Sequence, residues 1–405
     1  MKYELTPSQE VTFKKFKKFW KNRTKPLFQY DGGAGRGKTF MSYLLLEYTE
    51  IPPERIAVVA YTGRAAYNLI IRGLNAMTTH RFLYSPKTEL IPIKDPKTGE
   101  HMKDKDGNMQ FNKRLKWDKN DAREIAEKFD VIFIDEGYMV PTDIAEDIVK
   151  IGLPVIVTGD TNQLKPVSGE PYFLQNPDST LIEITRQAEG DPIVLMADDI
   201  LKHGHPNKEI YGPKARVSFL SDKLYNSDKF LEISKKSDIM LCNTNNFRQE
   251  INDIYREYIL DYPPTPVIGD RIICRKNNWG QCLEGIPLVN GLMGTITSLE
   301  MVSKPRNIYK MDFKLEGLDM LFTELLMNGD YITGKSSTIN FKEKYLSKDV
   351  DYFQYANCIT THLSQGSEWG KVIYMDDSFG SFDDKKRARY TAVTRAKKNL
   401  LYFEL

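Results

Sequence analysis

The sequence predicts an α/β protein built on parallel sheets, and three observations support that prediction. A glycine-rich loop at residues 32–39 lies between a short apolar run at 26–30 and a helix-forming stretch at 40–46. Short apolar runs recur along the chain and end in polar residues, as strands buried on both faces of a parallel sheet do. The length of 405 residues suggests about two or three domains, enough to bury sizeable cores.

The glycine-rich loop reads GGAGRGKT and fits the phosphate-binding pattern G-x-x-x-x-G-K-[ST] from Gly32 to Thr39. Its glycines let backbone N–H groups turn towards phosphate oxygens, and the positive end of the following helix adds to that field. We expect Lys38 to reach the β- and γ-phosphates of ATP and the Thr39 hydroxyl to ligate Mg²⁺. A glycine-rich turn with a chance Lys-Thr is the alternative, and the flanking strand and helix disfavour it.

The composition, with 41% hydrophobic and 28% charged residues, is that of a soluble globular chain. No apolar run approaches the length of a membrane span and the start does not resemble a secretory signal, so we expect a cytoplasmic protein that does not bind membranes. The four cysteines are far apart and form no C-x-x-C pair, which predicts ordinary buried thiols. They are Cys242, Cys274, Cys282 and Cys358.

Basic residues crowd residues 14–25 and 385–398, although the net charge is only +2. Such clusters permit nucleic acid binding, and solvated helix faces explain them equally well. At the start of the chain, Thr6 is predicted to cap a helix that has Pro7 in its first turn and Gln9 at the capping-box position.

Polar groups follow several apolar runs, and we expect them to meet at one edge of a sheet. The runs are 56–60, 131–134, 155–158 and 181–184. After the second run, Asp135 is suited to hold Mg²⁺ through its water shell and Glu136 to accept a proton from the attacking water. After the third, Gln163 can orient that water or sense the γ-phosphate. The fourth run ends near Arg186.

A further polar segment, residues 78–82, contains His80. A helix-capping or core imidazole is an equally good explanation for this histidine, and no spaced partner indicates metal ligation.

Two segments differ in character from the rest. Residues 85–118 contain prolines and the turn signal Asp106-Gly107, which predicts a protruding hairpin or a loop. Residues 263–345 are rich in Pro, Gly and short alternating strands, which predicts a small barrel.

The second half of the sequence has strand-like runs at 239–242, 371–375 and 400–403 but no phosphate loop. Such a half can still supply a cation to the nucleotide of the first half, and Arg395 is the residue that we expect to do so. A basic residue on an exposed helix is the alternative.

Eight motifs carry a family resemblance: GGAGRGKT, AYTGRAA, TTHRF, VIFIDEG, VTGDTNQLKPV, ITRQ, THLSQGSEW and YTAVTRAK. In this order, from residue 5 to 397, they resemble the motif series of superfamily 1B DNA helicases of the RecD/Dda branch. The resemblance implies two RecA-like domains with ATP between them. It also implies single-stranded DNA across their tops and translocation from 5′ to 3′.

The resemblance also implies roles for individual residues. For the nucleotide, Mg²⁺ and catalysis these are adenine contact by Gln9, phosphate contact by Gly33, Gly35, Gly37 and Lys38, metal contact by Thr39 and Asp135, the base Glu136, the γ-phosphate sensor Gln163, the arginines Arg186 and Arg395, and nucleotide contact by Gln365 and Gly366. For DNA they are Thr62, Gly63, Arg64, Thr79, His80, Phe82, Asn243, Thr361 and His362. Phe82 is expected to stack on bases.

The predicted domains follow from these motifs and insertions. They are a RecA-like ATP-binding domain (1–84 and 119–205) with a hairpin insertion (85–118), and a second RecA-like domain (206–262 and 346–405) with a β-barrel-like insertion (263–345). Three residues depart from the family pattern, namely Arg36, Gly137 and Lys165. None of them removes a catalytic group, but they leave nucleotide affinity and coupling open.

The predicted function is therefore that of an ATP-dependent 5′-to-3′ DNA helicase in replication, recombination or repair. We expect ATP and Mg²⁺ as cofactors, and single-stranded and forked duplex DNA as partners of a monomer, with single-strand-binding or replisome proteins as further partners. The alternatives are a nucleic-acid-stimulated ATPase that displaces bound proteins without separating strands, an RNA-directed helicase resembling Upf, and a DNA-free P-loop ATPase or kinase.

Overall fold

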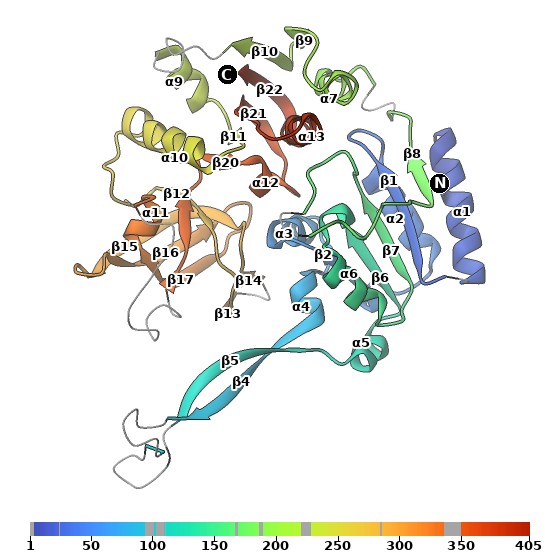
Figure 1. Ribbon diagram of the computed structural model, residues 1–405, viewed down its shortest axis with the longest axis horizontal. Coiled ribbons are helices and arrows are strands. Elements are labelled where there is room, and N and C mark those ends of the chain that lie inside the picture. Colours follow the sequence, from blue (N-terminus) through green and yellow to red (C-terminus); the bar gives the residue numbers. More distant parts are fainter. Residues whose placement is uncertain are drawn as a thin grey trace.

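The structure is a computed structural model of the 405-residue chain. It describes residues 4–23, 25–93, 101–102, 109, 111–166, 169–185, 189–219, 228–283, 286–335 and 350–405. Within these ranges the chain forms three six-stranded sheets and two hairpins (Figure 1).

The first sheet is parallel, with strand order β3-β2-β6-β7-β1-β8. Its strands are β1 (Leu27–Gly32), β2 (Ile56–Ala60), β3 (Ala76–Thr78), β6 (Val131–Asp135), β7 (Val155–Gly159) and β8 (Ser179–Leu181). The predicted parallel α/β architecture is confirmed here. The run at 181–184 is the exception: β8 stops at Leu181, and the next side chain, Ile182, is 64% exposed.

Helices cover both faces of the first sheet. One face packs against α1 (Pro7–Asn22), α2 (Lys38–Tyr48) and α3 (Gly63–Ile71). The other packs against α4 (Thr79–Leu83), α5 (Ala122–Lys128) and α6 (Thr142–Val149). We call this sheet with these helices the first half. Short turns of helix also occur at η1 (Pro53–Arg55), η2 (Gly137–Met139) and η3 (Tyr255–Ile259).

The second sheet has strand order β20-β11-β21-β22-β10-β9 and is parallel except for β9. Its strands are β9 (Ile210–Gly212), β10 (Ala215–Phe219), β11 (Ile239–Cys242), β20 (Cys358–Thr360), β21 (Trp369–Asp376) and β22 (Ala396–Glu404). One face packs against α7 (Pro192–His203) and α13 (Phe382–Val393), and the other against α9 (Asp228–Lys235) and α10 (Asn245–Ile254). With α12 (Thr361–Ser364) these elements form the second half.

Helix α7 does not follow the predicted domain limits. It lies within the range 119–205 that we predicted for the first domain, yet Ile193, Met196 and Ile200 belong to the core of the second sheet. The limit at residue 205 therefore comes after a helix that packs with the second half. The limit at residue 345 is too early, because the strands Val350–Asp351 and Phe353–Tyr355 belong to the sheet of the insertion. The other domain limits stay predictions.

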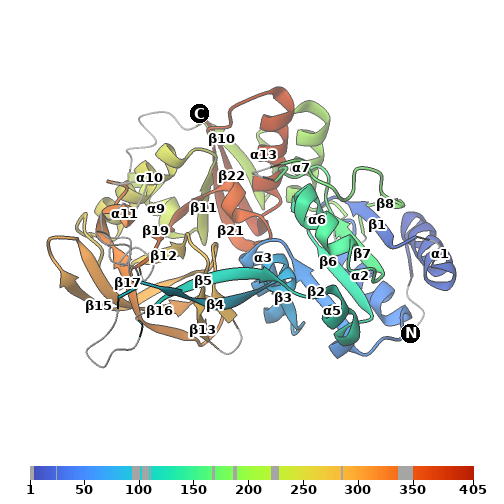
Figure 2. The same cartoon turned by 60° about the horizontal axis from the view of Figure 1, so that its bottom comes forward.

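The hairpin expected in residues 85–118 is present. Strands β4 (Tyr84–Pro92) and β5 (Phe111–Lys119) pair antiparallel along their full length. The hairpin extends away from the first sheet and towards the side of the molecule that holds the barrel (Figures 1 and 2). Its base is tied to the first half, because Lys119 Nζ lies 2.7 Å from a carboxylate oxygen of Asp147. The predicted turn Asp106-Gly107 lies outside the described residues.

The insertion in the second half is a barrel-like sheet with strand order β18-β17-β16-β15-β12-β19. Its strands are β12 (Arg271–Cys274), β15 (Met293–Ser303), β16 (Ile308–Leu315), β17 (Leu321–Asn328), β18 (Val350–Asp351) and β19 (Phe353–Tyr355), and the hairpin β13 (Asn278–Leu283) and β14 (Ile286–Leu288) and helix α11 (Gly329–Ile332) flank it. The two edge strands, β18 and β19, are separated in sequence by Tyr352 alone, so the edges lie close together and the sheet is nearly closed. The predicted small barrel is confirmed.

The thiols depart in part from expectation. Cys242, Cys274 and Cys358 are buried as predicted, whereas Cys282 on β13 is exposed because it lies on a two-stranded hairpin outside the barrel sheet. Among the helices that the structure describes, none combines the length and the apolar character that crossing a bilayer requires.

Candidate nucleotide site and nucleic-acid interface

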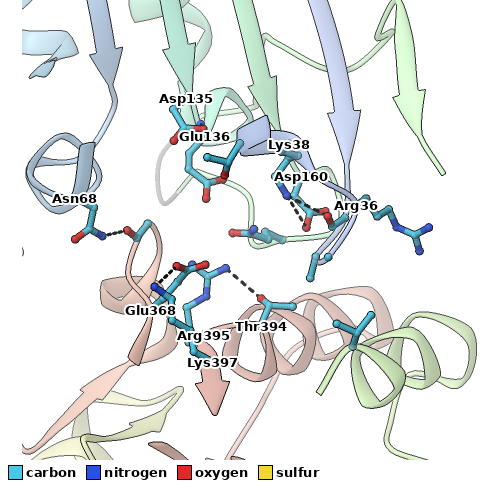
Figure 3. Close-up of a pocket in the computed structure, with 18 of the residues that line it drawn as sticks. Arg36, Lys38, Asn68, Asp135, Glu136, Asp160, Glu368, Thr394, Arg395 and Lys397 are labelled. Atoms are coloured by element: carbon cyan, nitrogen blue, oxygen red, sulfur yellow. Dashed lines mark hydrogen bonds and ion pairs between the residues drawn. The ribbon is translucent and has the colours of Figure 1, made fainter. Parts of the chain in front are cut away.

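A cleft of about 510 Å³ lies between the two halves (Figure 3). The first half contributes the phosphate loop, Asp135, Glu136, Asp160 and Gln163 to its walls. The second half contributes Gly366 and Glu368 from the segment before β21 and residues 394–397 from the turn after α13. The predicted motifs of both halves therefore meet at one site.

The phosphate loop has the backbone conformation that its glycines were expected to allow. Gly35 and Gly37 have φ angles of 71° and 82°, a region that side-chain-bearing residues rarely adopt. Lys38 Nζ donates hydrogen bonds to the carbonyl oxygens of Gly32, at 2.6 Å, and Gly33, at 3.2 Å. The same ammonium group lies 3.9 Å from Asp160 Oδ2. The loop thus presents its lysine at the cleft with buried oxygens around it.

Gln9 forms the predicted capping box at the start of α1. Its Oε1 accepts a hydrogen bond from the backbone of Thr6 at 3.1 Å, and its Nε2 lies 3.4 Å from the carbonyl oxygen of Arg36 in the loop. An added Cβ at Gly37 would come within 2.5 Å of that Nε2, so the amide packs directly on the loop. Adenine contact by Gln9 remains a prediction.

The acidic pair stands at the carboxyl end of β6. Glu136 has a φ angle of 52°, unusual for a residue with a side chain, and its backbone N–H donates to Asp135 Oδ1 at 3.0 Å. The backbone leaves no room for a side chain at the next position, because a Cβ at Gly137 would come within 2.2 Å of Val157 Cγ1. This packing accounts for Gly137 as a departure from the family pattern.

The surroundings of Glu136 change its acidity. Burial, followed by the neighbouring charge of Asp135, raises the pKa of Glu136 to about 7, while Lys38 and Arg395 act in the opposite direction. Burial also raises the pKa of Asp135. A carboxylate with a pKa near neutrality is well matched to accept a proton from water.

Thr39 and Asp135 line the same cleft and offer a hydroxyl and a carboxylate oxygen. Mg²⁺ in nucleotide sites usually takes one or two protein oxygens and completes its shell with phosphate oxygens and water. The two residues therefore fit a Mg²⁺ ion bound together with a nucleotide.

Gln163 and Arg395 reach the cleft from opposite halves and are each 4% exposed. Arg395 Nε donates to the carbonyl oxygen of Thr391 at 2.9 Å and Nη1 to that of Ser367 at 3.2 Å, so the guanidinium is held in place. Figure 3 shows Arg395 on the wall opposite Glu136. The alternative of an arginine on an exposed helix is wrong. The second predicted arginine, Arg186, lies outside the described residues.

Gln365 and Gly366 behave differently from one another. Gly366 lines the cleft, whereas Gln365 is 2% exposed and its Nε2 donates to the carbonyl oxygen of Leu164 at 3.0 Å. The predicted nucleotide contact of Gln365 is therefore corrected: its amide joins the two halves beside the cleft.

Several predicted DNA contacts are buried. Thr79 and Thr361 are 0% exposed, and the Thr361 hydroxyl donates within the second half, to a backbone carbonyl and to Asn243 Oδ1. Phe82 is 2% exposed and packs against Phe129, with ring centroids 6.1 Å apart. The expectation that Phe82 stacks on bases is wrong, because α4 turns this ring into the core of the first half.

Arg64 and Gly63 also face protein. Arg64 is 8% exposed and its Nε donates to Ser367 Oγ of the second half at 3.0 Å. A Cβ at Gly63 would come within 2.0 Å of Val289 Cγ2, beside the barrel. The structure therefore corrects the predicted DNA contact of Arg64 to a contact between halves. Four of the predicted DNA contacts keep accessible side chains: Thr62, His80, Asn243 and His362.

Other residues of the cleft were missed from the sequence. Glu368 pairs with Lys397 at 2.8 Å and with Arg72 at 3.3 Å, and all three line the cleft. Glu368 lies in the motif THLSQGSEW and Lys397 in the motif YTAVTRAK, so their place in these motifs could have predicted a position at the cleft. Arg36, which also departs from the family pattern, lies 3.2 Å from Asp198 on α7 and so links the phosphate loop to the second half. Lys165, the third, pairs with Glu170 at the surface.

Comparison with known proteins assigns the chain to a family. Residues 15–222, more than half of the chain, match the family model described as "AAA domain". The chain belongs to this AAA domain family. In this AAA domain protein, residues 355–401 also match the model of a UvrD-like helicase C-terminal domain.

Curated relatives include RecBCD enzyme subunit RecD of Buchnera aphidicola subsp. Schizaphis graminum, 24% identical over 92% of this chain and 69% of the relative. They also include ATP-dependent RecD2 DNA helicase of Deinococcus radiodurans, 22% identical over 90% of this chain and 45% of the relative, so this AAA domain protein spans less than half of that length.

Solved structures show the same fold. One structure of Pif1 helicases with forked double-stranded DNA has a TM-score of 0.55 and 17% identity, covering 99% of this chain and 92% of that chain. A Bacteroides Pif1 helicase in complex with ADP-AlF3 and single-stranded DNA has a TM-score of 0.53 at 17% identity, with the same coverage. Together these matches bear out the resemblance to the RecD branch of superfamily 1B, and no specific likeness to Dda is among them.

Proposed function

We propose that this AAA domain protein is an ATP-dependent DNA helicase that moves 5′ to 3′ on single-stranded DNA and separates duplex at forks. The observation that carries the proposal is the two-sided cleft, in which Lys38, Asp135 and Glu136 of one half face Arg395 of the other. A site divided between two halves makes hydrolysis depend on how closely the halves approach, and that dependence is what converts hydrolysis into movement.

Within the cleft the residues divide the chemistry. Lys38 and the amides of the phosphate loop bind the phosphates, and Glu136 accepts the proton of the attacking water. Arg395 stabilises the charge that develops on the transferred group. Thr39 and Asp135 would hold Mg²⁺, which would neutralise phosphate charge when bound. Gln163 orients the water from its buried position in the wall of the same cleft.

The choice of DNA is supported by the relatives. RecD2 is named as a DNA helicase, and the Pif1 structures contain single-stranded and forked DNA. In this chain the accessible members of the DNA motifs, Thr62, His80, Asn243 and His362, come from both halves. A strand that crosses both halves would change its contacts as the cleft opens and closes, which supports stepping along that strand.

The antiparallel hairpin β4–β5 favours strand separation over the alternative of an ATPase that only displaces proteins. It leaves the first half directly after α4, which carries His80, and Met109 and Phe111 near its far end are 49% and 42% exposed. Exposed apolar side chains near the far end of the hairpin are suited to block the second strand at a fork. The cytoplasmic location, the monomeric state, the protein partners and the pathway stay predictions.

The decisive experiment is unwinding of matched 5′-tailed and 3′-tailed duplexes, in DNA and in RNA, with ATP and Mg²⁺. We expect unwinding of the 5′-tailed DNA, and a Lys38→Ala preparation serves as control for contaminating helicases. Unwinding of the 3′-tailed substrate alone would show movement from 3′ to 5′ and contradict the proposed direction. ATP hydrolysis stimulated by single strands without any unwinding would favour the protein-displacing ATPase, and a lack of stimulation would favour a DNA-free ATPase.

A further inference from the structure

Helix α13 of the second half carries a tyrosine whose hydroxyl touches the phosphate loop of the first half. Tyr390 is 1% exposed. Its Oη accepts a hydrogen bond from the Ala34 backbone N–H at 2.9 Å and donates to Asp160 Oδ2 at 2.7 Å. Ala34 lies in the middle of the loop and Asp160 follows β7, so one atom of the second half joins two segments that line the cleft.

Asp160 needs this hydroxyl. The carboxylate is 1% exposed, and its Oδ1 accepts hydrogen bonds from the backbone N–H of Asn162 at 3.0 Å and from Asn162 Nδ2 at 3.2 Å. Its Oδ2 has Tyr390 at hydrogen-bond distance and the Lys38 ammonium at 3.9 Å. A buried carboxylate oxygen without a hydrogen bond is unfavourable, so the arrangement with the halves in contact depends on the hydrogen bond from the Tyr390 hydroxyl to Asp160.

The tyrosine belongs to a row of contacts along one face of α13. One turn before Tyr390, Arg387 Nη1 donates to the carbonyl oxygen of Gln163 at 3.0 Å. Directly after Tyr390, Thr391 Oγ1 accepts a hydrogen bond from the Leu164 backbone N–H at 3.0 Å. These contacts and the one between Tyr390 and Asp160 all fall on residues 160–164 of the first half. Tyr390 is not one of the described residues that line the cleft, so it contacts the phosphate loop from outside the cleft.

We propose that Tyr390 is a positioning residue that couples the approach of the two halves to the conformation of the phosphate loop. When the halves meet, its hydroxyl satisfies the Ala34 N–H and Asp160 together, and when they part both lose it. The inference rests on the proposed function only in taking the cleft as the ATP site. It adds to Arg395 a second link by which the second half acts on the nucleotide.

Tyr402 offers a matched control. It is 0% exposed, and its hydroxyl donates to Asp376 Oδ2, a carboxylate whose side chain is 4% exposed. Both partners belong to the second half. Replacing either tyrosine by phenylalanine removes one buried hydroxyl from one buried aspartate, and Tyr390 alone makes that contact across the cleft.

The test compares the wild-type protein, Tyr390→Phe and Tyr402→Phe in equilibrium binding of a fluorescent ATP analogue, in ATP turnover with single-stranded DNA, and in thermal unfolding. We expect Tyr390→Phe to bind the analogue at least about tenfold more weakly, equivalent to about 1.4 kcal/mol. We expect its kcat/KM for ATP to fall by a similar factor at temperatures well below its thermal midpoint, whereas Tyr402→Phe should bind the analogue as the wild type does.

Equal binding by the two variants would overturn the proposal. A lowered thermal midpoint in Tyr390→Phe with unchanged analogue binding and turnover would also overturn it, because the hydroxyl would then serve stability alone. Since the binding arm needs no DNA, a wild-type protein that binds the analogue without stimulation by DNA would remove the helicase proposal and leave the result for Tyr390 standing.

Discussion

At the scale of single residues, the cleft shows how position sets chemistry. Glu136 and Asp135 are neighbours at the end of β6, where Glu136 has a left-handed backbone and its N–H donates to Asp135 Oδ1. Burial and the charge of Asp135 raise the pKa of Glu136 to about 7. We therefore expect the role proposed for Glu136 to depend on pH in a range where an exposed glutamate is fully ionised.

Glu136 should give ATP turnover an acid limb. Because a glutamate must be ionised to accept a proton, kcat/KM for ATP should fall as the pH drops through about 7, the pKa that the structure gives for Glu136. The measurement is the pH profile of kcat/KM with Mg²⁺ and single-stranded DNA in excess. A profile that stays flat through neutral pH would contradict the role of Glu136 as base.

Lys38 and Glu136 should fail in different ways when replaced. Lys38→Ala should lose nucleotide binding and turnover, because the ammonium neutralises phosphate charge. Glu136→Gln should bind ATP but scarcely hydrolyse it, because its amide cannot accept the proton. Equilibrium nucleotide binding and single-turnover hydrolysis distinguish the two, and near-wild-type turnover in either variant would remove the site assignment.

Arg395 should contribute chiefly to turnover. Its replacement by alanine should lower kcat by roughly 10³-fold or more with a modest loss of ATP affinity, as for arginines that stabilise transition-state charge. Arg389→Ala is the control, since Arg389 lies on α13 and pairs with Asp376 at 2.7 Å within the second half. An effect of Arg395→Ala on KM alone would indicate ordinary ground-state binding.

At the scale of elements, apolar runs predicted the strands well because burial on both faces leaves a clear pattern. Runs 56–60 and 131–134 correspond closely to β2 and β6. The run at 181–184 misled because its apolar residues continue beyond the sheet, with Ile182 exposed. The packing of α7 on the second sheet could not be predicted either, since an apolar helix face does not specify which sheet covers it.

The hypothesis that the hairpin β4–β5 blocks the second strand at a fork can be tested by deletion. Replacing residues 92–112 with a short Gly-Ser turn keeps Lys119 and its ion pair with Asp147 at the hairpin base. We expect single-strand-stimulated ATP hydrolysis to be largely preserved and duplex unwinding to be abolished, because the motor residues lie outside this segment. Strand-displacement and ATPase assays on one preparation give both answers. Unwinding at the normal rate would show that the hairpin is dispensable, and loss of both activities would point to misfolding of the first half.

At the scale of the whole molecule, two of the residues whose roles were predicted wrongly, Arg64 and Gln365, lie at the contact between halves. The phosphate loop and acidic pair could be predicted because their chemistry is local in sequence. Arg64, Gln365 and Phe82 could not, because a polar or aromatic residue in a motif reads the same whether it faces DNA, the other half or the core. Tyr390 was quoted in a motif, but its partners Ala34 and Asp160 are far away in sequence.

Arg64 gives the sharpest test of this distinction. Each phosphate contact made by a cation to a single strand contributes about −0.7 to the slope of log K against log salt concentration. If Arg64 contacted DNA, Arg64→Ala would make that slope shallower by this amount. The structure instead places Arg64 against Ser367 Oγ at 3.0 Å, with its guanidinium 6.0 Å from the ring centre of Trp369.

We therefore expect Arg64→Ala to keep the wild-type salt slope for binding of single-stranded DNA while stimulation of ATP turnover by DNA falls. The reason is that Ser367 lies between Gly366 and Glu368, which line the cleft, so a loosened contact misplaces the second wall of the ATP site. Titrations of a labelled oligonucleotide at several salt concentrations, with ATPase assays on the same protein, provide the measurement. A shallower slope with normal stimulation would return Arg64 to the DNA interface and contradict the arrangement of the two halves described above.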